Sequence, residues 1–484
     1  MRLLLRRPLG LLALASVVTA LTVVAGLVPG AFAGSTGAPA GHGVPPHNRY
    51  AGPDGTSSMH GDSGASDTTP YAGPGADPAT PVSVPLAGVC PTILAGVDGL
   101  PQALCTSYAD RAPTLYLLDP ATGAPLARLA LQKGSLLGGV YAYVDAHGRM
   151  VTADGSGDLL LVGHHETATG WELTVDDRVP LRPAFRRACG APDCDAISTV
   201  APGFDGRVWF ATAAGRAGYA DPASGRVVMR RLGHGEIVAN SIATSPDGVS
   251  VVTDHATYLL RAGASGAVHQ VWRRAYARGK ARKPGQLSHG SGATPTFFGP
   301  RTGHELVAMT DNARPREHLL VYRADTGRTV CSVPLFGRRN SGTENSPIGW
   351  RRQVYVASTY GYPYPATPDG AGEAQPASAD FVGGMQKIHV GRHGCRTVWR
   401  TRTASAAVPR LSRAEGVLYT VTRTGAAPSY RLARISPRTG RVLSETDLGA
   451  GPGADTLQMV GTILPDGTLL QGFVTGLTLV GAGS

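Results

Sequence analysis

From about residue 86 to the end of the chain, short apolar runs alternate with polar residues and are separated by turn sequences. This alternation has the period of two that places every second side chain on one face of a β-strand. No stretch shows the 3.6-residue period of a convincing amphipathic helix. We therefore predict a single all-β domain over residues 86–484.

Two kinds of turn recur along this domain and alternate with each other. Asp satisfies turn backbone locally and Gly supplies a positive φ, so both kinds are typical of hairpins. The first kind, D-x-x-G or a variant, occurs at Asp145–Gly148, Asp205–Gly206, Asp247–Gly248, Gly303, Trp350, Gly416 and Asp466–Gly467. The second kind, D-P-x-[TS]-G or a relative, occurs at Asp119–Gly123, Asp221–Gly225, Gly266, Asp325–Gly327, Gly394 and Gly440.

A strand-only chain that repeats itself every roughly 40 to 65 residues is typical of a β-propeller. The first turn occurs seven times, so we predict seven blades, with six or eight left open. The run Thr114–Leu131 contains a turn of the second kind that no turn of the first kind precedes. The run Thr468–Val480 follows a turn of the first kind and has no turn of the second kind after it. Pairing these N- and C-terminal strands closes the ring and removes exposed edges. A pair of β-sandwiches is the alternative, which the regular turns disfavour.

The N-terminus has the pattern of a secretory signal peptide. Arg2, Arg6 and Arg7 precede the apolar run Leu9–Val28, and a small-x-small site ends at Ala33. We predict residues 1–33 to be a Sec signal peptide cleaved after Ala33, and the protein to be secreted. An uncleaved membrane anchor is the alternative, because the run is long enough to span a bilayer.

Residues 34–85 are rich in Gly, Pro and Ser and have few large apolar side chains. Such a segment buries too little surface to offset its ordering entropy, so we predict a mostly disordered linker. The sequence SSMHGD within it, with His60 and Asp62, leaves a second reading open, in which the segment is an arm lying on the domain.

The formal net charge is +11, and it falls to +8 when the three Arg of residues 1–33 are removed. This balance allows adhesion to small anionic or envelope ligands. No nucleic-acid motif is present, and after signal cleavage no apolar run is long enough to span a membrane. We predict a monomer with no nucleic-acid partner and, after signal cleavage, no transmembrane segment.

Six cysteines in an exported chain predict disulfides. Fifteen pairings are possible, and spacing favours Cys90–Cys105, Cys189–Cys194 and Cys331–Cys395, the last between neighbouring blades. None of the cysteines has zinc-site spacing with His.

Several motifs carry a resemblance to known propellers over most of residues 50–480. They are SSMHGD, RKPGQLSHGSGATPT, VAMTDN, TGRTVCSVPLF, TENSPIG and PRLSRAEGVLYT. On these motifs the chain resembles exported bacterial β-propeller proteins of unassigned function, and it is similar to PQQ-binding-like (quinoprotein-type) and SMP-30/gluconolactonase-like propellers. The resemblance implies the fold. The adjacent-cysteine disulfide and the Trp docking repeat of quinoprotein enzymes are missing, so PQQ is not expected.

In a propeller, the start of each innermost strand and the corner after the second strand face the same channel mouth. Oxygen-bearing side chains concentrate at these positions in three neighbouring units, those of Asn240, Asp311 and Glu344. Glu344, Asn345, Asp311, Asn312 and Asn240 form a candidate metal set, because calcium takes six to eight oxygen ligands. Thr294, Tyr360, Arg423 and Asp254 at the same mouth are candidate ligand-binding residues.

A calcium ion at this mouth would polarise a lactone or ester carbonyl, with His289 or His255 as a candidate catalytic base. The resemblance to SMP-30-like enzymes implies the same kind of Glu/Asn/Asp site, although their spacing is not reproduced. Two other readings stay open. These groups cap strand ends for structural reasons, or they bind a ligand without chemistry.

A run of six positive charges, Arg273, Arg274, Arg278, Lys280, Arg282 and Lys283, leads into the unit of Thr294. It is either a loop that attracts an anionic ligand to the channel mouth or a solvated surface. The first function predicted is a secreted binding or scaffold propeller of the cell envelope or extracellular space. A calcium-dependent lactonase or esterase of SMP-30-like type is the alternative, and a PQQ-dependent oxidoreductase is third.

Overall fold

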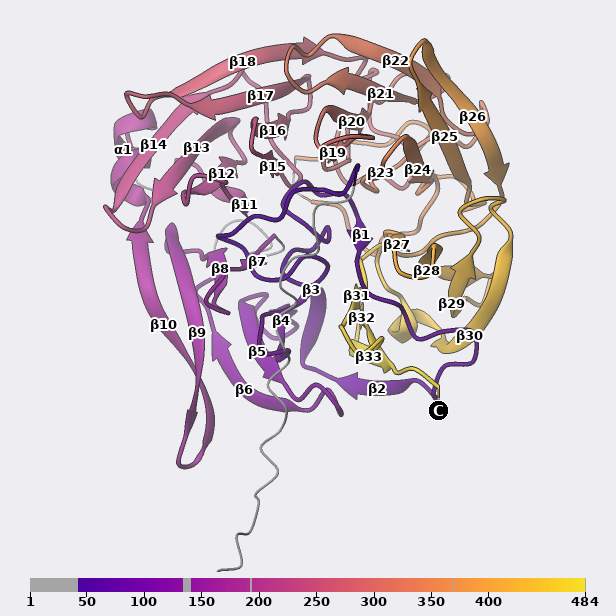
Figure 1. Ribbon diagram of the computed structural model, residues 1–484, viewed down its shortest axis with the longest axis horizontal. Coiled ribbons are helices and arrows are strands. Elements are labelled where there is room, and N and C mark those ends of the chain that lie inside the picture. The colour runs from indigo at the N-terminus through magenta and orange to yellow at the C-terminus, as the bar shows by residue number, and fades with distance from the viewer. Residues whose placement is uncertain (1–41, 134–140, 192–193, 369, 484) are drawn as a thin grey trace, which may run out of the picture. The chain divides into compact units, whose positions relative to one another are not determined.

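The computed structural model describes residues 42–133, 141–191, 194–368 and 370–483. The predicted signal peptide, residues 1–33, lies outside these residues. Eight antiparallel sheets of mostly four strands are arranged as the blades of a β-propeller (Figure 1). The all-β propeller is confirmed, and the count of seven blades is wrong.

The first four blades follow one another without interruption in the chain. They comprise β3 (Gly88–Ala95), β4 (Pro101–Ser107), β5 (Pro113–Leu118) and β6 (Pro125–Ala130) in blade 1; β7 (Tyr143–Val144), β8 (Met150–Ala153), β9 (Asp158–Thr167) and β10 (Gly170–Pro180) in blade 2; β11 (Ile197–Pro202), β12 (Val208–Thr212), β13 (Arg216–Asp221) and β14 (Arg226–Arg231) in blade 3; and β15 (Ala243–Ser245), β16 (Gly248–Val252), β17 (Ala256–Ala262) and β18 (Val268–Ala275) in blade 4. In each blade the first strand is innermost and the fourth outermost (Figure 1).

The last four blades include two strands from the N-terminal segment. They comprise β19 (Thr296–Phe298), β20 (Leu306–Thr310), β21 (His318–Arg323) and β22 (Thr329–Pro334) in blade 5; β23 (Ile348–Trp350), β24 (Gln353–Ala357), β25 (Met385–Gly391) and β26 (Gly394–Thr401) in blade 6; β27 (Arg410–Ser412), β28 (Val417–Thr424), β29 (Ser429–Ile435) and β30 (Val442–Ala450), with β1 (Thr68–Thr69), in blade 7; and β31 (Thr462–Ile463), β32 (Leu469–Phe473), β33 (Gly476–Val480) and β2 (Val82–Pro85) in blade 8.

The missing blade is blade 1, and its signal is present in the sequence. Asp98–Gly99 forms the turn between β3 and β4, with Gly99 at φ 77° and Leu100 N–H donating to Asp98 Oδ1 at 3.2 Å. This is an eighth turn of the first kind, so Thr114–Leu131 is the outer half of a complete blade. The seven turns that predict seven blades begin only at Asp145.

N- and C-terminal strands do close the ring, but with a different N-terminal partner. The outermost strand of blade 8 is β2, which pairs antiparallel with β33 from Val82–Leu479 to Pro85–Gly476. This strand lies inside the segment predicted to be a linker. Closure therefore joins three C-terminal strands to one N-terminal strand within a single sheet.

The apolar core lies between adjacent blades, where inward-facing side chains of neighbouring sheets pack face to face. Trp209 and Tyr219 of blade 3, for example, pack with Val251 and Tyr258 of blade 4. Two short helices accompany the sheets, α1 (Arg182–Cys189) and η1 (Pro452–Ala454). Neither was predicted, because eight and three residues are too few to show a helical period. No helix among the described residues has the length and apolar character needed to cross a bilayer.

All three predicted disulfides are confirmed. Cys90–Cys105 joins β3 to β4, Cys189–Cys194 closes the end of α1, and Cys331–Cys395 joins β22 of blade 5 to β26 of blade 6. Disulfides of this number fit an extracellular protein.

Residues 42–81, which we call the arm, lie on the propeller and are largely buried, although a mostly disordered linker was predicted there. In Figure 1 the arm crosses the centre of the ring. It first contacts hairpin turns between first and second strands, where Gly43 N–H donates to Arg301 O and Ala51 bridges Asp145. The arm therefore begins at the end of the channel opposite the predicted mouth, and farther along it reaches Thr294 and Ser346 just before β19 and β23.

Backbone hydrogen bonds attach the arm to the innermost strands around the ring. Six such bonds, each 2.7–3.0 Å, are Ala95 N to Thr56 O, Val144 N to Ser57 O, Thr244 N to Ser63 O, Phe297 N to Gly64 O, Gly349 N to Ser66 O and Leu411 N to Asp67 O. Asn48 Nδ2 donates to Pro202 O of blade 3 at 3.0 Å. The arm thus contacts blades 1 to 7 through hydrogen bonds that need no large apolar side chains. This explains how a segment of low hydrophobicity is ordered here.

Candidate functional site

Two of the five predicted metal ligands, Asp311 and Asn312, are hydrogen-bonded within the fold. Asp311 accepts hydrogen bonds from the N–H groups of Ala313 and His318, and its Oδ2 is 3.0 Å from His318 Nδ1. Asn312 Nδ2 donates to the carbonyls of Arg278 and Ala281. No group of three or more His, Cys, Asp or Glu side chains among the described residues is placed to hold a metal ion. Asp311 and Asn312 therefore stabilise a strand corner and the loop above it.

The predicted bases His255 and His289 lie on either side of one ion pair. Arg278 Nη2 is 2.8 Å from Asp254 Oδ2 and 3.2 Å from His289 Nδ1. His255 Nδ1 is 3.0 Å from Asp254 Oδ1, which also accepts the Ile237 N–H. His289 Nε2 is 3.2 Å from Gly279 O, so both of its ring nitrogens have partners. This cluster holds the loop at the mouth in place.

The remaining predicted ligand-binding residues do not form one site. Thr294 is buried and contacts the arm, with its Oγ1 3.2 Å from His60 Nε2. Tyr360 is half-buried and its N–H donates to Ser358 Oγ. Arg423 donates its backbone N–H to Ala404 O at 2.9 Å. Of the three, Thr294 has a role that the sequence did not suggest, since it joins blade 5 to the arm.

A buried polar network centred on His60 connects the arm to blades 5 and 6. His60 Nδ1 is 2.9 Å from Asp67 Oδ1 and 3.2 Å from Ser346 Oγ, and Ser346 Oγ also donates to Asp67 Oδ2. With Thr294 on Nε2, the imidazole has a partner on each nitrogen. All four side chains are less than a tenth exposed, so solvent and substrates do not reach the network.

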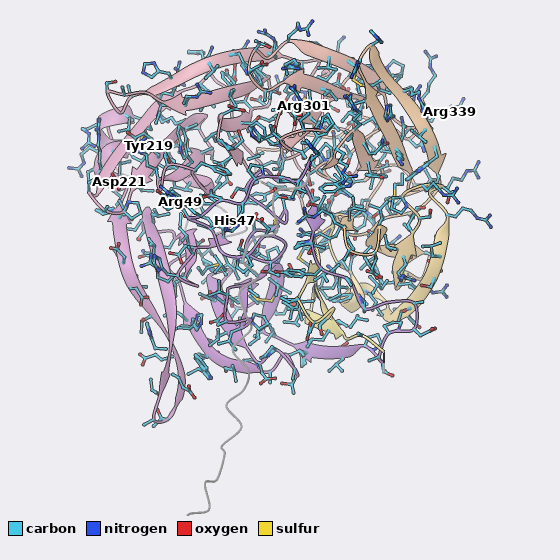
Figure 2. All side chains as sticks on the ribbon, in the orientation of Figure 1. His47, Arg49, Tyr219, Asp221, Arg301 and Arg339 are labelled. Carbon is cyan, nitrogen blue, oxygen red and sulfur yellow. A yellow bond between two sulfur atoms is a disulfide. The ribbon has the colours of Figure 1, made fainter. Side chains whose placement is uncertain are left out.

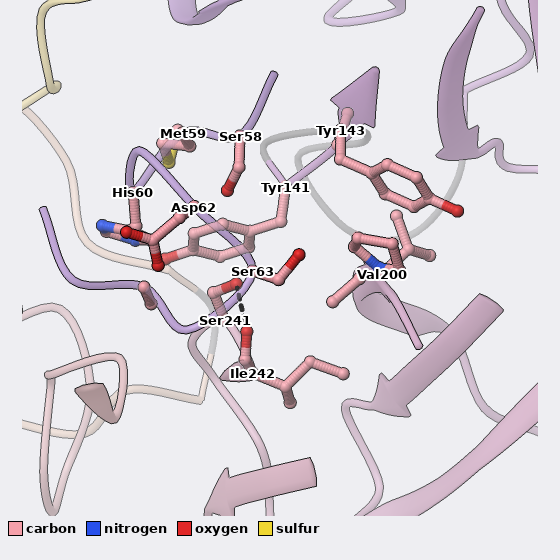
Figure 3. A pocket seen from close by; sticks show the side chains of 14 residues that line it. Ser58, Met59, His60, Asp62, Ser63, Tyr141, Tyr143, Val200, Ser241 and Ile242 are labelled. Carbon is pink, nitrogen blue, oxygen red and sulfur yellow. Dashed lines mark hydrogen bonds between the residues drawn. The ribbon is translucent and has the colours of Figure 1, made fainter. Parts of the chain in front are cut away.

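Next to this network, the arm and blades 2 to 4 enclose a cavity of about 20 Å³ (Figure 3). Asp62, Tyr141 and Ser241 contribute polar groups to its lining. A volume of this size holds a single water molecule. Burial raises the pKa of Asp62 to about 6, and the Asp54 carboxylate adds to the shift. The cavity is too small for an organic ligand.

Glu344 lies two residues before Ser346 in the chain, so it is farther from the arm and closer to the predicted mouth. Its Oε1 accepts the N–H groups of Leu287 at 2.5 Å and Ser288 at 3.3 Å. Burial raises its pKa to about 8, outweighing these hydrogen bonds. Glu344 is therefore protonated near neutral pH, and a neutral carboxyl is a poor ligand for calcium.

Two tyrosines that sequence reasoning missed lie beside Glu344. Burial, with the Glu344 carboxyl as the next cause, raises the pKa of both Tyr141 and Tyr364. The Tyr141 hydroxyl is 3.5 Å from Asn240 Oδ1, and Tyr364 packs on Tyr362 with ring centroids 4.9 Å apart. Tyr141 lies two residues before β7 and Asn240 three residues before β15, so an inspection of strand starts would have found it.

We call Tyr141, Asn240, Glu344 and Tyr364 the axial recess. Each keeps part of its surface accessible. Burial is nevertheless the largest cause of the pKa shifts of Tyr141, Glu344 and Tyr364, so protein surrounds them closely. The Glu344 carboxyl contributes to the pKa shifts of both tyrosines, which places these three side chains near one another. Of the predicted residues, the structure thus assembles Glu344 and Asn240, whereas Asn345 Nδ2 donates away from the recess to Gln458 Oε1.

Three of the six positive residues in the basic run have acidic partners. Arg273 pairs with Glu236 at 2.7 Å and Arg278 with Asp254 at 2.8 Å. Lys283 is buried 3.4 Å from Glu317 and donates to Ala313 O. Burial lowers the pKa of Lys283 and raises that of Glu317. These pairs attach the loop to the propeller, and among the described residues Arg274, Lys280 and Arg282 of the run have no acidic partner.

Comparisons with known proteins show no family. No protein-family model matches the chain. An uncharacterized protein of Archaeoglobus fulgidus (strain ATCC 49558) is 25% identical over 333 residues, which cover 62% of this chain and 63% of that protein. The match therefore spans less than two thirds of the relative's length.

Solved structures that resemble this chain include BamB from Moraxella catarrhalis, with a TM-score of 0.48 and 13% identity over 84% of this chain and 98% of that one. The Myceliophteria thermophila Cps50 (Swd1) β-propeller domain has a TM-score of 0.35 and 12% identity, covering 54% and 77%. A chain of the Mitotic Checkpoint Complex has a TM-score of 0.40 and 10% identity, covering 73% and 86%. These similarities assign no activity, and the resemblance to PQQ-binding-like and SMP-30-like propellers stays a prediction.

Proposed function

We propose that this protein is an exported β-propeller that binds a small, neutral, hydroxyl-rich ligand of the saccharide type in the axial recess. The observation that carries the proposal is the chemistry of the recess. Its hydrogen-bonding groups are an amide, two phenols and a carboxyl whose pKa is about 8. All of these groups are uncharged near neutral pH, and each both donates and accepts hydrogen bonds.

Aromatic side chains support the same ligand class. Tyr364 and Phe381 both pack on Tyr362, with centroid distances of 4.9 and 5.1 Å. Tyrosine rings offer an apolar face and a polar edge, which suits the mixed surface of a sugar. A few convergent polar groups on an aromatic wall are typical of small-molecule sites. Export is favoured by the three disulfides.

The test is calorimetric titration with a panel of neutral monosaccharides and their oligomers at pH 7. We expect Glu344→Gln to keep the affinity within about twofold, because both side chains are neutral there. Glu344→Ala and Tyr141→Phe each remove a hydrogen bond to the ligand and should weaken binding about tenfold. His255→Ala, at the same mouth but outside the recess, should leave the affinity unchanged.

Two results would contradict the proposal. One is that no neutral saccharide of the panel produces heat or shifts the melting temperature. The other is that Glu344→Gln abolishes binding as completely as Glu344→Ala, since the ligand would then require a carboxylate.

A further inference from the structure

Four arginines gather at the outer rim where blades 5 and 6 meet, on the same face as the axial recess. Arg316 lies in the corner loop before β21, Arg338 and Arg339 lie between β22 and β23, and Arg400 lies near the end of β26. We call these four residues the arginine rim. Arg338, Arg339 and Arg400 are exposed, and Figure 2 shows Arg339 at the edge of the ring.

Hydrogen bonds to neutral groups hold two of these guanidinium groups close together. Arg316 Nη2 donates to Pro334 O at 3.0 Å, and the same carbonyl accepts Gln386 Nε2 at 3.3 Å. Gln386 Oε1 in turn accepts Arg400 Nε at 3.0 Å. Arg316 and Arg400 are therefore linked through one carbonyl and one amide, and no carboxylate stands between them.

The positive charge of the arginine rim is not compensated. Among the described residues none of the four is in an ion pair, whereas Arg273, Arg278 and Lys283 of the basic run each have an acidic partner. Partial burial and then the charges of Arg400 and Arg338 lower the pKa of Arg316. Mutual repulsion of this kind persists only where no acid is close, and it is relieved when an anion binds.

The strands beneath the arginine rim are joined covalently. Cys331 of β22 and Cys395 of β26 form the disulfide between blades 5 and 6. The disulfide therefore fixes β22, which precedes the loop of Arg338 and Arg339, relative to β26, which carries Arg400. A preorganised group of charges loses less entropy on binding than one assembled by the ligand.

We propose that the arginine rim is a binding site for a polyanion that carries repeated phosphate groups, such as a phosphate-bearing envelope polymer. Guanidinium groups bind phosphate oxygens through paired N–H donors, which makes arginine suited to phosphate. Four guanidiniums from three separate segments follow the rim, so successive phosphates of one chain can bind successive arginines. The rim contains no aromatic side chain that would stack on bases, which favours a polymer without them.

The experiment measures binding of labelled long-chain inorganic polyphosphate to the exported protein at about 50 mM salt, where screening is weak. The test variant is Arg338→Gln/Arg339→Gln/Arg400→Gln. The matched control is Arg128→Gln/Arg186→Gln/Arg187→Gln, which removes three exposed charges from blade 1 and α1. We expect the Kd of the test variant to rise at least tenfold and that of the control less than twofold.

Affinity of the wild-type protein should also fall steeply as salt is raised to about 300 mM, because phosphate contacts release counterions. Equal losses in the two triple variants, or no binding of polyphosphate by the wild type, would overturn the proposal. Tighter rim-dependent binding of single-stranded DNA, or of phosphatidylglycerol vesicles, would overturn it in favour of a nucleic acid or a lipid surface. The double variant Arg338→Gln/Arg339→Gln, confined to an exposed loop, gives the same readout if Arg400 proves necessary for folding.

Discussion

The arm side and the mouth side of the propeller channel hold similar polar residues in opposite states. At the arm end, His60, Asp67, Ser346 and Thr294 are buried and hydrogen-bonded to one another. At the other end, the residues of the axial recess keep accessible surface, and Glu344 has a pKa of about 8. Both sets come from the starts of innermost strands or from the arm that reaches them.

The difference shows that residue type and strand position do not distinguish a structural network from a binding site. Ser346 and Glu344 lie two residues apart before β23 of blade 6, yet the arm contacts only Ser346. The two side chains differ in the number of hydrogen-bond partners that the rest of the protein provides. A polar group whose partners are all protein contributes to stability, and one with accessible surface is available to a ligand.

The largest effect is expected from Asp67→Ala at the arm end. Asp67 is fully buried, and its removal leaves His60 and Ser346 without their acceptor. Asp67 also has φ 53°, a conformation that Asn tolerates better than Ala. We expect Asp67→Ala to lower the free energy of unfolding by about 3–5 kcal/mol, measured by urea denaturation.

Asp67→Asn keeps the backbone preference and one acceptor, so it should cost clearly less than Asp67→Ala. Asp119→Ala, in an exposed hairpin turn of blade 1, is the matched control and should cost about 1 kcal/mol or less. Equal effects of Asp67→Ala and Asp119→Ala would mean that the arm end contributes no special stability.

A smaller effect is expected from Glu344→Gln, and it depends on pH. The folded protein keeps the Glu344 proton up to a pH of about 8, whereas the unfolded chain releases it above its ordinary pKa of 4.5. The folded state binds the extra proton between these values, so the free energy of unfolding falls as pH rises from 4.5 through 8. A Gln side chain does not titrate, so the free energy of unfolding of the variant does not fall for this reason.

The variant and the wild type should therefore melt at nearly the same temperature at pH 4, and the variant should melt about 2–5 °C higher at pH 9. The difference between the two proteins, followed by calorimetry, cancels the other titrating groups. A variant that is less stable than the wild type at pH 9 would show that Glu344 is ionised in the folded protein.

The smallest effect is expected from calcium. Glu344 is protonated near neutral pH and Asp311 is saturated by His318 and two backbone N–H groups. Adding calcium or EDTA at pH 7 should thus shift the melting temperature by about 1 °C or less, because a bound ion stabilises only in proportion to its affinity. A rise of several degrees that Glu344→Ala and Asp311→Ala abolish would restore the predicted metal site.

Local sequence predicted much of the fold because turn chemistry is local. Each D-G or D-x-x-G turn needs only its own residues to satisfy the backbone, so the hairpins were visible in the sequence, as were the disulfides between Cys331 and Cys395 and within blade 1. The sequence also contains the turn of the eighth blade, at Asp98–Gly99, which the predicted set of turns did not include. The arm was not visible, since its order depends on backbone groups that distant strands offer.

The candidate site was predicted in part for the same reason. Strand order placed Asn240 and Glu344 at one mouth, but it could not indicate that Asp311 binds His318 or that Thr294 is covered by His60. Those partners come from loops and from the arm, whose paths depend on the packing of the whole ring.

The sequence alone determined the strands, the turns, the propeller class and the cysteine pairs, because each depends on short-range periodicity, turn geometry or spacing. The tertiary structure alone decided that the arm seals one end of the channel, that Glu344 keeps its proton, and that the positive charge of Arg316 and Arg400 stays uncompensated. Burial and electrostatic neighbours are properties of all chain segments that meet at one place, and no single segment specifies them.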